Sequence, residues 1–316
     1  MNGPLGELSA LASALSAAPA LAAASAVAAS AGRAMFVGSG DSLSACLFAE
    51  AAGHRALSAG DLAWADQIPP LLGSVVGVSH SGRTRATVRA LERAHEAGLG
   101  TVAITADGDS AIAAVADRAV VVPRLDLAET IPAAGYVFLA LAVLEVAGGA
   151  AIGGARRVGE NLAALAASAG SVRGGIPSTR PLGISILTLP DMRSAGDFWS
   201  LKAVEATGLC VRSVPLEESG HVDYFIGPQA HLTVQLIGAS GQARHARLAR
   251  ALADNGHAVV SIDATRQLNE PDPLHKQLAV AAFGACFAHE LSVRWNLTPF
   301  RNGDVPMDAS HIQIMA

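Results

Sequence analysis

The sequence predicts an α/β fold made of two tandem three-layer αβα sandwiches with parallel sheets, arranged as two copies of a pseudo-twofold repeat. Short continuous apolar runs, amphipathic stretches between them and an internal repeat all point to this fold. Residues 34–37, 74–78, 101–105 and 119–122 are typical of strands buried on both faces. Residues 84–97 carry apolar side chains at helical spacing. This alternation predicts βαβ units in a doubly wound sheet.

The internal repeat relates the two halves of the chain. Three pairs of segments match in the same order, at a spacing of about 155 to 159 residues. They are residues 50–53 with 205–208, 81–82 with 240–241, and 98–104 with 256–262. Each half is therefore expected to form its own domain.

The second half repeats the alternation of strands and helices. Strands are expected at residues 183–189, 211–214, 232–237 and 258–262, and helices at residues 195–207, 242–255 and 274–295. The expected organisation is N-terminal helices at 1–31, a first domain at 32–150, a linker with a helix at 151–180, a second domain at 181–296 and a tail at 297–316. Within the linker, residues 155–167 favour a helix and the Gly/Ser/Pro-rich residues 168–181 favour a loop.

Charge and cysteine content limit the function classes. The net charge is −5 and no run of lysine or arginine occurs, which argues against nucleic acid or an anionic membrane as partner. The most apolar stretch, 136–155, contains Glu145 and predicts a buried helix rather than a membrane span. Cys46, Cys210 and Cys286 lack metal-ligand spacing and fit a reducing cytoplasm. We expect a small-molecule partner, no metal and no cofactor.

A loop rich in hydroxyl groups joins one strand to the next helix. The segment Ser79-His80-Ser81-Gly82-Arg83-Thr84 places three hydroxyls near a helix start, where unpaired backbone N–H groups and the helix dipole attract anions. An ordinary turn with serine caps is the alternative. The matching positions of the second half carry Gly238, Ala239, Ser240 and Ala243, so the fold itself does not require the hydroxyls. We therefore predict an anion site in the first half.

A second small-residue loop, Gly38-Ser39-Gly40-Asp41-Ser42, follows the first predicted strand. Ligands of such sheets gather at the carboxyl ends of the strands, so Ser42 and Gly40 are expected beside Ser79. A nucleotide site is a weaker alternative, because the loop lacks the third glycine of a dinucleotide fingerprint.

With these loops, residues 33–316 resemble the sugar isomerase (SIS) family. The similarity is to its double-domain members, such as the isomerase half of glucosamine-6-phosphate synthase and the amino-sugar-phosphate deaminases. The resemblance implies that Ser79, Ser81 and Thr84 bind a sugar phosphate together with Ser42, and that His80 stands where relatives often have glutamine. It also implies a homodimer whose active site lies at or near the subunit interface.

The resemblance extends to a catalytic spacing in the second half. Lys202 and Glu205 share one face of a predicted helix, and His221 follows in a polar loop. In the family the glutamate moves a proton between two sugar carbons, the lysine sits beside it and the histidine assists ring opening. A surface ion pair is the alternative interpretation of an isolated Lys-x-x-Glu.

Two regions depart from the family pattern. His311, which the resemblance makes a candidate catalytic residue, stands where synthase-type relatives have a lysine in a tail that folds over the sugar. In residues 124–131 Thr130 is retained and is expected to contact the substrate, but Glu129 and Ile131 replace serine and lysine. We therefore hypothesise a phosphosugar isomerase, acting on an aldose/ketose or amino-sugar phosphate with or without amine loss. The alternative is a non-catalytic sugar-phosphate sensor.

Overall fold

The computed structural model describes residues 3–18, 33–68, 72–148, 154–226 and 230–300. The chain divides into two compact units, each with one parallel sheet. The unit with the first sheet includes Ala18–Asp126 and Ala134–Ala155. The unit with the second sheet includes Met1–Ala17, Leu127–Ala133 and Arg156–Val305.

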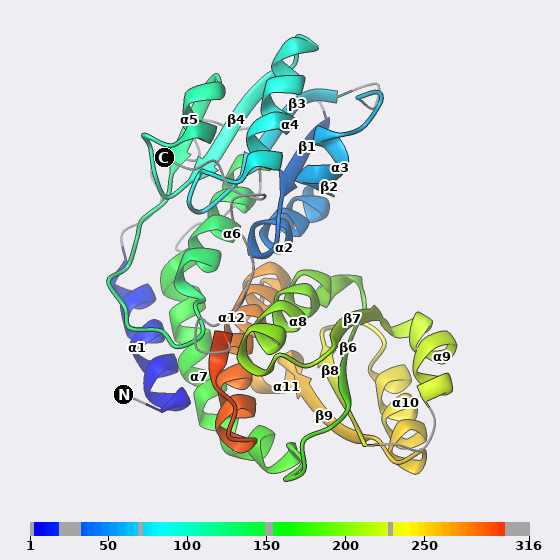
Figure 1. The fold of residues 1–316 in the computed structure, drawn as a ribbon. Helices are drawn as coiled ribbons and strands as arrows, with labels where there is room; N and C mark the ends of the chain where they lie inside the picture. Colours follow the sequence, from blue (N-terminus) through cyan, green and yellow to red (C-terminus); the bar gives the residue numbers. More distant parts are fainter. Residues whose placement is uncertain (1–2, 19–32, 69–71, 149–153, 227–229, 301–316) are drawn as a thin grey trace. The chain divides into compact units, whose positions relative to one another are not determined.

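The first sheet has five parallel strands in the order β2-β1-β3-β4-β5 (Figure 1). Their bounds are Arg33–Gly38 for β1, Arg55–Ser58 for β2, Leu72–Val78 for β3, Gly100–Thr105 for β4 and Arg118–Val121 for β5. Four of these strands were predicted. Strand β2 was not, because it is short, lies at the sheet edge and buries no residue fully, so it has no continuous apolar signal.

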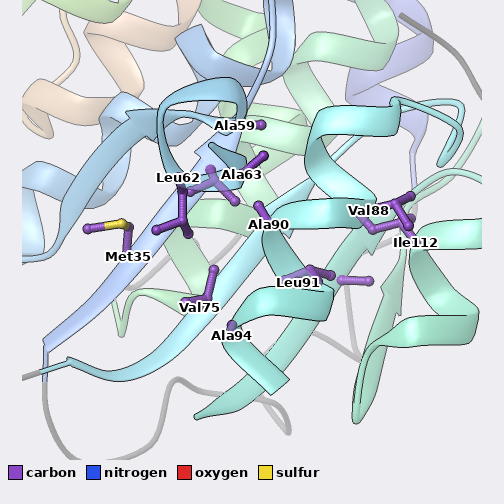
Figure 2. Close-up of a cluster of buried hydrophobic side chains, with 12 residues drawn as sticks. Met35, Ala59, Leu62, Ala63, Val75, Val88, Ala90, Leu91, Ala94 and Ile112 are labelled. Atoms are coloured by element: carbon purple, nitrogen blue, oxygen red, sulfur yellow. The ribbon is translucent and has the colours of Figure 1, made fainter. Parts of the chain in front are cut away.

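Helices cover both faces of the first sheet. Their bounds are Asp41–Cys46 for α2, Ala59–Ala63 for α3, Arg85–Glu96 for α4, Ala111–Val115 for α5 and Ala134–Val146 for α6, with a 3-10 turn, η2, at Leu47–Ala52. Helices α3, α4 and α5 pack on the face that carries Met35 and Val75 (Figure 2). Helices α2 and α6 contact each other and the strands but contribute nothing to that cluster, so they cover the other face. Helix α6 is buried on nearly all sides, as expected of its uniformly apolar sequence.

The second sheet has four parallel strands in the order β7-β6-β8-β9. Their bounds are Gly183–Thr188 for β6, Val211–Pro215 for β7, His231–Ile237 for β8 and Ala258–Asp263 for β9. All four strands were predicted. The first four strands of the first sheet and the four strands of the second sheet are arranged in the same order. In each half, the first strand lies between the second and the third, and the fourth lies next to the third.

The helices of this unit include the three long ones expected from the sequence. The bounds are Pro4–Ala17 for α1, Gly154–Gly175 for α7, Arg193–Thr207 for α8, Ser219–Val222 for α9, Gln242–Asp254 for α10, Ala264–Gln267 for α11 and Pro273–Arg294 for α12. Short 3-10 turns lie at Pro190–Met192 (η3), Leu216–Glu218 (η4) and Asp223–Ile226 (η5). Helices α8 and α12 pack together through Trp199, whose Nε1 donates to the carbonyl of Val280 at 2.7 Å.

Two local expectations differ from the structure. Helix α7 continues to Gly175, although a loop was expected from residue 168. Its apolar residues Val158, Leu162, Leu165 and Val172 are all buried at helical spacing, so tertiary packing outweighs the weak helix propensity of glycine and serine. N-terminal helices were expected over residues 1–31. Helix α1 ends at Ala17 and belongs to the unit of the second sheet, and residues 19–32 lie outside the described ones.

Across the described residues, no helix combines the length and the apolar character that a bilayer crossing requires.

Candidate functional site

The hydroxyl-rich loops lie where the strand order of the first sheet reverses. Strands β1 and β3 are hydrogen-bonded neighbours, but the chain goes on to β2 on one side and to β4 on the other. Loops that leave such a pair in opposite directions open a crevice at the carboxyl ends of the strands. Val37 pairs with Gly77, so the loops at 39–42 and 79–84 start side by side. The structure thus brings together the predicted residues Gly40, Ser42, Ser79, Ser81 and Thr84.

The loop at 79–84 is organised by internal hydrogen bonds. Ser79 is buried, and its Oγ lies 3.1 Å from Oγ1 of Thr84. The amide of Arg83 donates to Oγ of Ser81 at 3.3 Å. Thr84 is the N-cap residue of α4, but in the described structure its side chain makes no capping bond, so capping does not account for this hydroxyl. Ser81 and Thr84 are half-buried, which leaves them accessible to a ligand.

Gly82 is required by both backbone and packing. Its φ is +67°, a region that favours glycine. A Cβ there would overlap the side chain of Ser110 and lie 3.0 Å from Oγ1 of Thr105. The amide of Ile112 also donates to the carbonyl of Gly82 at 3.0 Å. The neighbouring segment at 105–112 therefore fixes the shape of the loop.

The two glycines of the loop at 38–42 are explained by close packing and by a positive φ. A Cβ on Gly38 would lie 2.7 Å from the backbone carbon of Ser42, so the start of α2 can approach β1 only because Gly38 lacks a side chain. Gly40 has a φ of +57°. Ser42 is buried at the first turn of α2. The small residues thus place Ser42 and the first amides of α2 close to the strand end.

His80 lies against the first turn of α6, since a Cβ on Gly135 would lie 2.7 Å from its Nε2. Loss of solvent around the ring lowers the pKa of His80, the charge of Arg124 lowers it further, and Asp41 opposes both. His80 is therefore neutral at pH 7, and Arg124 is a cation near the loop. The Nε of Arg124 donates to the carbonyl of Ala106 at 2.9 Å, which fixes its position. Sequence reasoning missed this role, because Arg124 follows a different strand.

The matching place of the second sheet is occupied by a carboxylate. Strands β6 and β8 form the corresponding reversal of strand order. There the amide of Ser240 donates to Oδ2 of Asp191 at 3.0 Å, and a Cβ on Gly238 would lie 2.7 Å from Cγ of Asp191. The amide of Ser240, in the loop that follows β8, is therefore already bonded to a carboxylate of the protein itself. An external anion would therefore have to compete with the carboxylate of Asp191 at this place.

Lys202 and Glu205 form a direct ion pair on α8. The Nζ of Lys202 lies 2.8 Å from Oε2 of Glu205 and 5.0 Å from the centre of the Phe198 ring. Lys202 is only 1% exposed, whereas the Glu205 side chain is 30% exposed. The pair is therefore not the surface ion pair considered as an alternative. A carboxylate held by a buried ammonium and open to solvent is suited to exchanging a proton with a ligand.

The remaining predicted residues lie on other elements. His221 is exposed on α9, which packs against the 3-10 turns on either side of it. Thr130 belongs to the unit of the second sheet, where its amide and hydroxyl donate to the carboxylate of Glu7 at 3.0 and 2.6 Å. Its expected contact with a sugar stays a prediction. His311 lies outside the described residues.

In the described part of the chain, no three His, Cys, Asp or Glu side chains are arranged to hold a metal ion.

Comparison with known proteins places the fold among proteins of sugar phosphates. No protein-family model matches the chain. Over 46 residues it is 56% identical to N-acetylmuramic acid 6-phosphate etherase of Symbiobacterium thermophilum, which is 15% of this chain and 15% of the etherase. Glucosamine-6-phosphate deaminase of Thermotoga maritima has a TM-score of 0.76 at 17% identity, covering 94% of this chain and 96% of the deaminase.

A second solved structure gives the same result. Tagatose-6-phosphate ketose/aldose isomerase of Escherichia coli has a TM-score of 0.71 at 17% identity, covering 96% of this chain and 92% of the isomerase. The chain therefore has the fold of phosphosugar isomerases and other SIS-domain proteins, and the resemblance drawn from the sequence is confirmed for the fold.

Proposed function

We propose that this protein is an enzyme that isomerises a phosphorylated sugar or amino sugar, with or without loss of an amine. The observation that carries the proposal is the hydroxyl-rich loop at 79–84, which follows β3 where the strand order of the first sheet reverses. Its hydroxyls and the first amides of α4 and α2 suit a phosphate dianion. The shared fold with enzymes named for phosphosugar substrates supports the same conclusion.

The catalytic roles in this proposal follow from the ion pair on α8. Glu205 accepts the proton from one sugar carbon and returns it to the neighbouring carbon. The buried ammonium of Lys202 keeps Glu205 ionised and stabilises the negative oxygen of an enediolate. His221 exchanges the proton that opens the sugar ring. Ser42, Ser79, Ser81 and Thr84 hold the phosphate, beside Gly40 and His80.

The proposal extends to the assembly of the protein. It comprises two SIS domains at residues 32–150 and 181–296, supported by the equal order of four strands in both sheets. It also includes a homodimer in the cytoplasm, with His221 of one subunit near the site of the other. The exposed position of His221 on α9 is compatible with such sharing.

A sugar-phosphate sensor is the second candidate. It is favoured by Thr130, whose two donors are engaged by Glu7 and not directed to a ligand. It is also favoured by His311 in the place of a lysine. Such a protein would keep the phosphate loop without productive chemistry.

A panel of sugar phosphates separates the two candidates. Glucose, fructose, tagatose and glucosamine 6-phosphates and N-acetylmuramic acid 6-phosphate are tested for thermal stabilisation, and then by NMR for solvent deuterium uptake at carbon 2, or at carbon 1 of the two ketoses. The enzyme exchanges deuterium, and Glu205→Gln abolishes the exchange but keeps the stabilisation. Stabilisation of the wild type without exchange favours the sensor.

Variants of two serines test the phosphate loop in the same assay. Ser81→Ala is expected to weaken binding, whereas Ser240→Ala, at the matching position of the second half, leaves it unchanged. Equal binding by both variants would contradict the assignment of the loop.

A further inference from the structure

The segment that carries His221 has little structure of its own. Between β7 and β8 the chain forms η4, α9 and η5, each only three or four residues long. Helices this short are not stable alone, because each fixes several residues for very few hydrogen bonds. The position of the exposed His221 therefore depends on contacts that the flanking residues make with the sheet.

Asp223, two residues after His221, makes one of these contacts through an ion pair of its buried carboxylate. Its side chain is fully buried. Its Oδ1 accepts from Nη2 of Arg212 at 2.6 Å and from Oγ of Ser185 at 2.7 Å. Ser185 on β6 and Arg212 on β7 are partners in the sheet register, so both groups stand on a rigid support. On the other side of His221, Leu216 and Ser219 are also buried.

The hydrogen bonds of this cluster are mutually consistent. A hydroxyl has one proton and two lone pairs, so Ser185 donates to Asp223 and accepts from Nε of Arg212 at 3.1 Å. Its second lone pair accepts from a protonated Nε2 of His231 at 2.9 Å. Ser185 thereby uses its full bonding capacity.

Arg212 is the cation that balances the buried carboxylate. Burial lowers the pKa of His231 to about 4; the nearby His257 and Arg212 lower it further, and Asp223 opposes them. Burial also lowers the pKa of His257. Both histidines that face the cluster are therefore neutral at pH 7, and the charge on Asp223 is compensated by Arg212.

We infer that Asp223 is a positioning residue, which with Arg212 and Ser185 holds the segment 216–226 so that His221 is aligned for catalysis. The inference rests on the proposed function of His221. Asp223 itself touches no substrate in this scheme. Its removal is expected to lower the turnover rate and to leave phosphate binding intact, because the loop at 79–84 belongs to the other compact unit.

The experiment compares Asp223→Asn with Glu217→Gln. Glu217 lies on the same segment, but its ion pair with Arg244 is exposed, so Glu217→Gln is the matched control. Deuterium uptake at carbon 2 gives kcat and KM for the panel sugar that exchanges fastest, and titration gives the Kd of inorganic phosphate. We expect Asp223→Asn to lower kcat by about 10²-fold with KM and Kd unchanged, since small displacements of a catalytic group have effects of this size. Arg212→Lys, which keeps the positive charge beside Asp223, should retain a higher kcat than Asp223→Asn.

Amide hydrogen exchange supplies a readout that does not need turnover. In Asp223→Asn the amides of 216–226 should exchange faster, while those of α8 do not change. If Asp223→Asn has the same kcat and the same amide exchange rates at residues 216–226 as Glu217→Gln, the inference is wrong. If Asp223→Asn does not fold, Ser185→Ala decides in its place, because it removes the hydroxyl that bonds Asp223, Arg212 and His231 but keeps the ion pair between Arg212 and Asp223.

A failure of the proposed function gives a different pattern. In that case His221→Ala leaves deuterium uptake unchanged, or no panel sugar exchanges. Faster amide exchange of 216–226 in Asp223→Asn would still support the anchoring, and unchanged amide exchange would overturn it.

Discussion

Gly82→Ala tests whether the shape of the loop at 79–84, and not only its hydroxyls, creates the anion site. The substitution adds one methyl group at a φ of +67°, and this group would overlap the side chain of Ser110. A left-handed conformation costs a non-glycine residue about 1–2 kcal/mol, and overpacking adds about 1–3 kcal/mol. We therefore expect the free energy of unfolding to fall by about 2–5 kcal/mol.

Gly98→Ala is the matched control for this variant. Gly98 follows α4 and has a φ of +74°, but a Cβ there would meet no atom within 4 Å. Gly98→Ala therefore carries the backbone strain of about 1–2 kcal/mol without the overlap. Each kcal/mol should shift the melting temperature by about 2–4 °C in a domain of this size.

Urea denaturation measures stability, and titration with inorganic phosphate measures binding. Ser110 can relieve the overlap only if the loop or the segment 105–112 moves, so Gly82→Ala should also weaken phosphate binding tenfold or more, about 1.4 kcal/mol. Gly98→Ala should bind phosphate like the wild type. If the two variants have the same stability and the same phosphate affinity, the reasoning from the loop geometry is refuted.

Three further predictions concern the second unit. The pKa of His231 is lowered to about 4 in the folded protein, so between pH 6.5 and pH 4 the unfolded chain is protonated at this residue while the folded chain is not. The free energy of unfolding should therefore fall by about 3 kcal/mol as the pH drops from 6.5 to 4. Urea denaturation of His231→Gln that keeps the full pH dependence would contradict this. Gly284→Ala would place a Cβ 2.6 Å from Nε1 of Trp199, so it should lower the free energy of unfolding by about 1–3 kcal/mol and change the tryptophan fluorescence. The control is Gly174→Ala in α7, where a Cβ meets no atom within 4 Å and stability should be unchanged or increased. Lys202→Met keeps the volume of a buried side chain, so we expect melting to change little and deuterium uptake to fall by about 10²-fold; unchanged uptake would remove Lys202 from the mechanism.

The secondary structure was largely readable from the sequence, and the exceptions have physical reasons. Strands such as β3 and β8 are buried on both faces, and therefore leave a continuous apolar run. Strand β2 is an edge strand without a fully buried residue and left no such signal. The second half of α7 was missed because glycine and serine weaken the local signal, while its helix is stabilised by packing.

The candidate site was predicted in composition but not in its surroundings. The hydroxyls of 79–84 and the spacing of Lys202 and Glu205 are local features that a chain shows directly. Arg124 and Asp191 were missed, because they reach the two loops from other strands. The bonds from Thr130 to Glu7, more than a hundred residues earlier in the chain, were likewise not readable from the local sequence.

The sequence by itself determined the α/β alternation and the hydroxyl-rich turn at the start of α4, because hydrophobic periodicity and turn chemistry act over a few residues. Tertiary structure alone decided that this turn lies at the reversal of strand order, because that position depends on which strands become neighbours. It also decided that Asp191 fills the matching place of the second sheet and that Lys202 is buried. Burial and pairing of charges arise from residues far apart in the chain, and they give the two matching turns different surroundings.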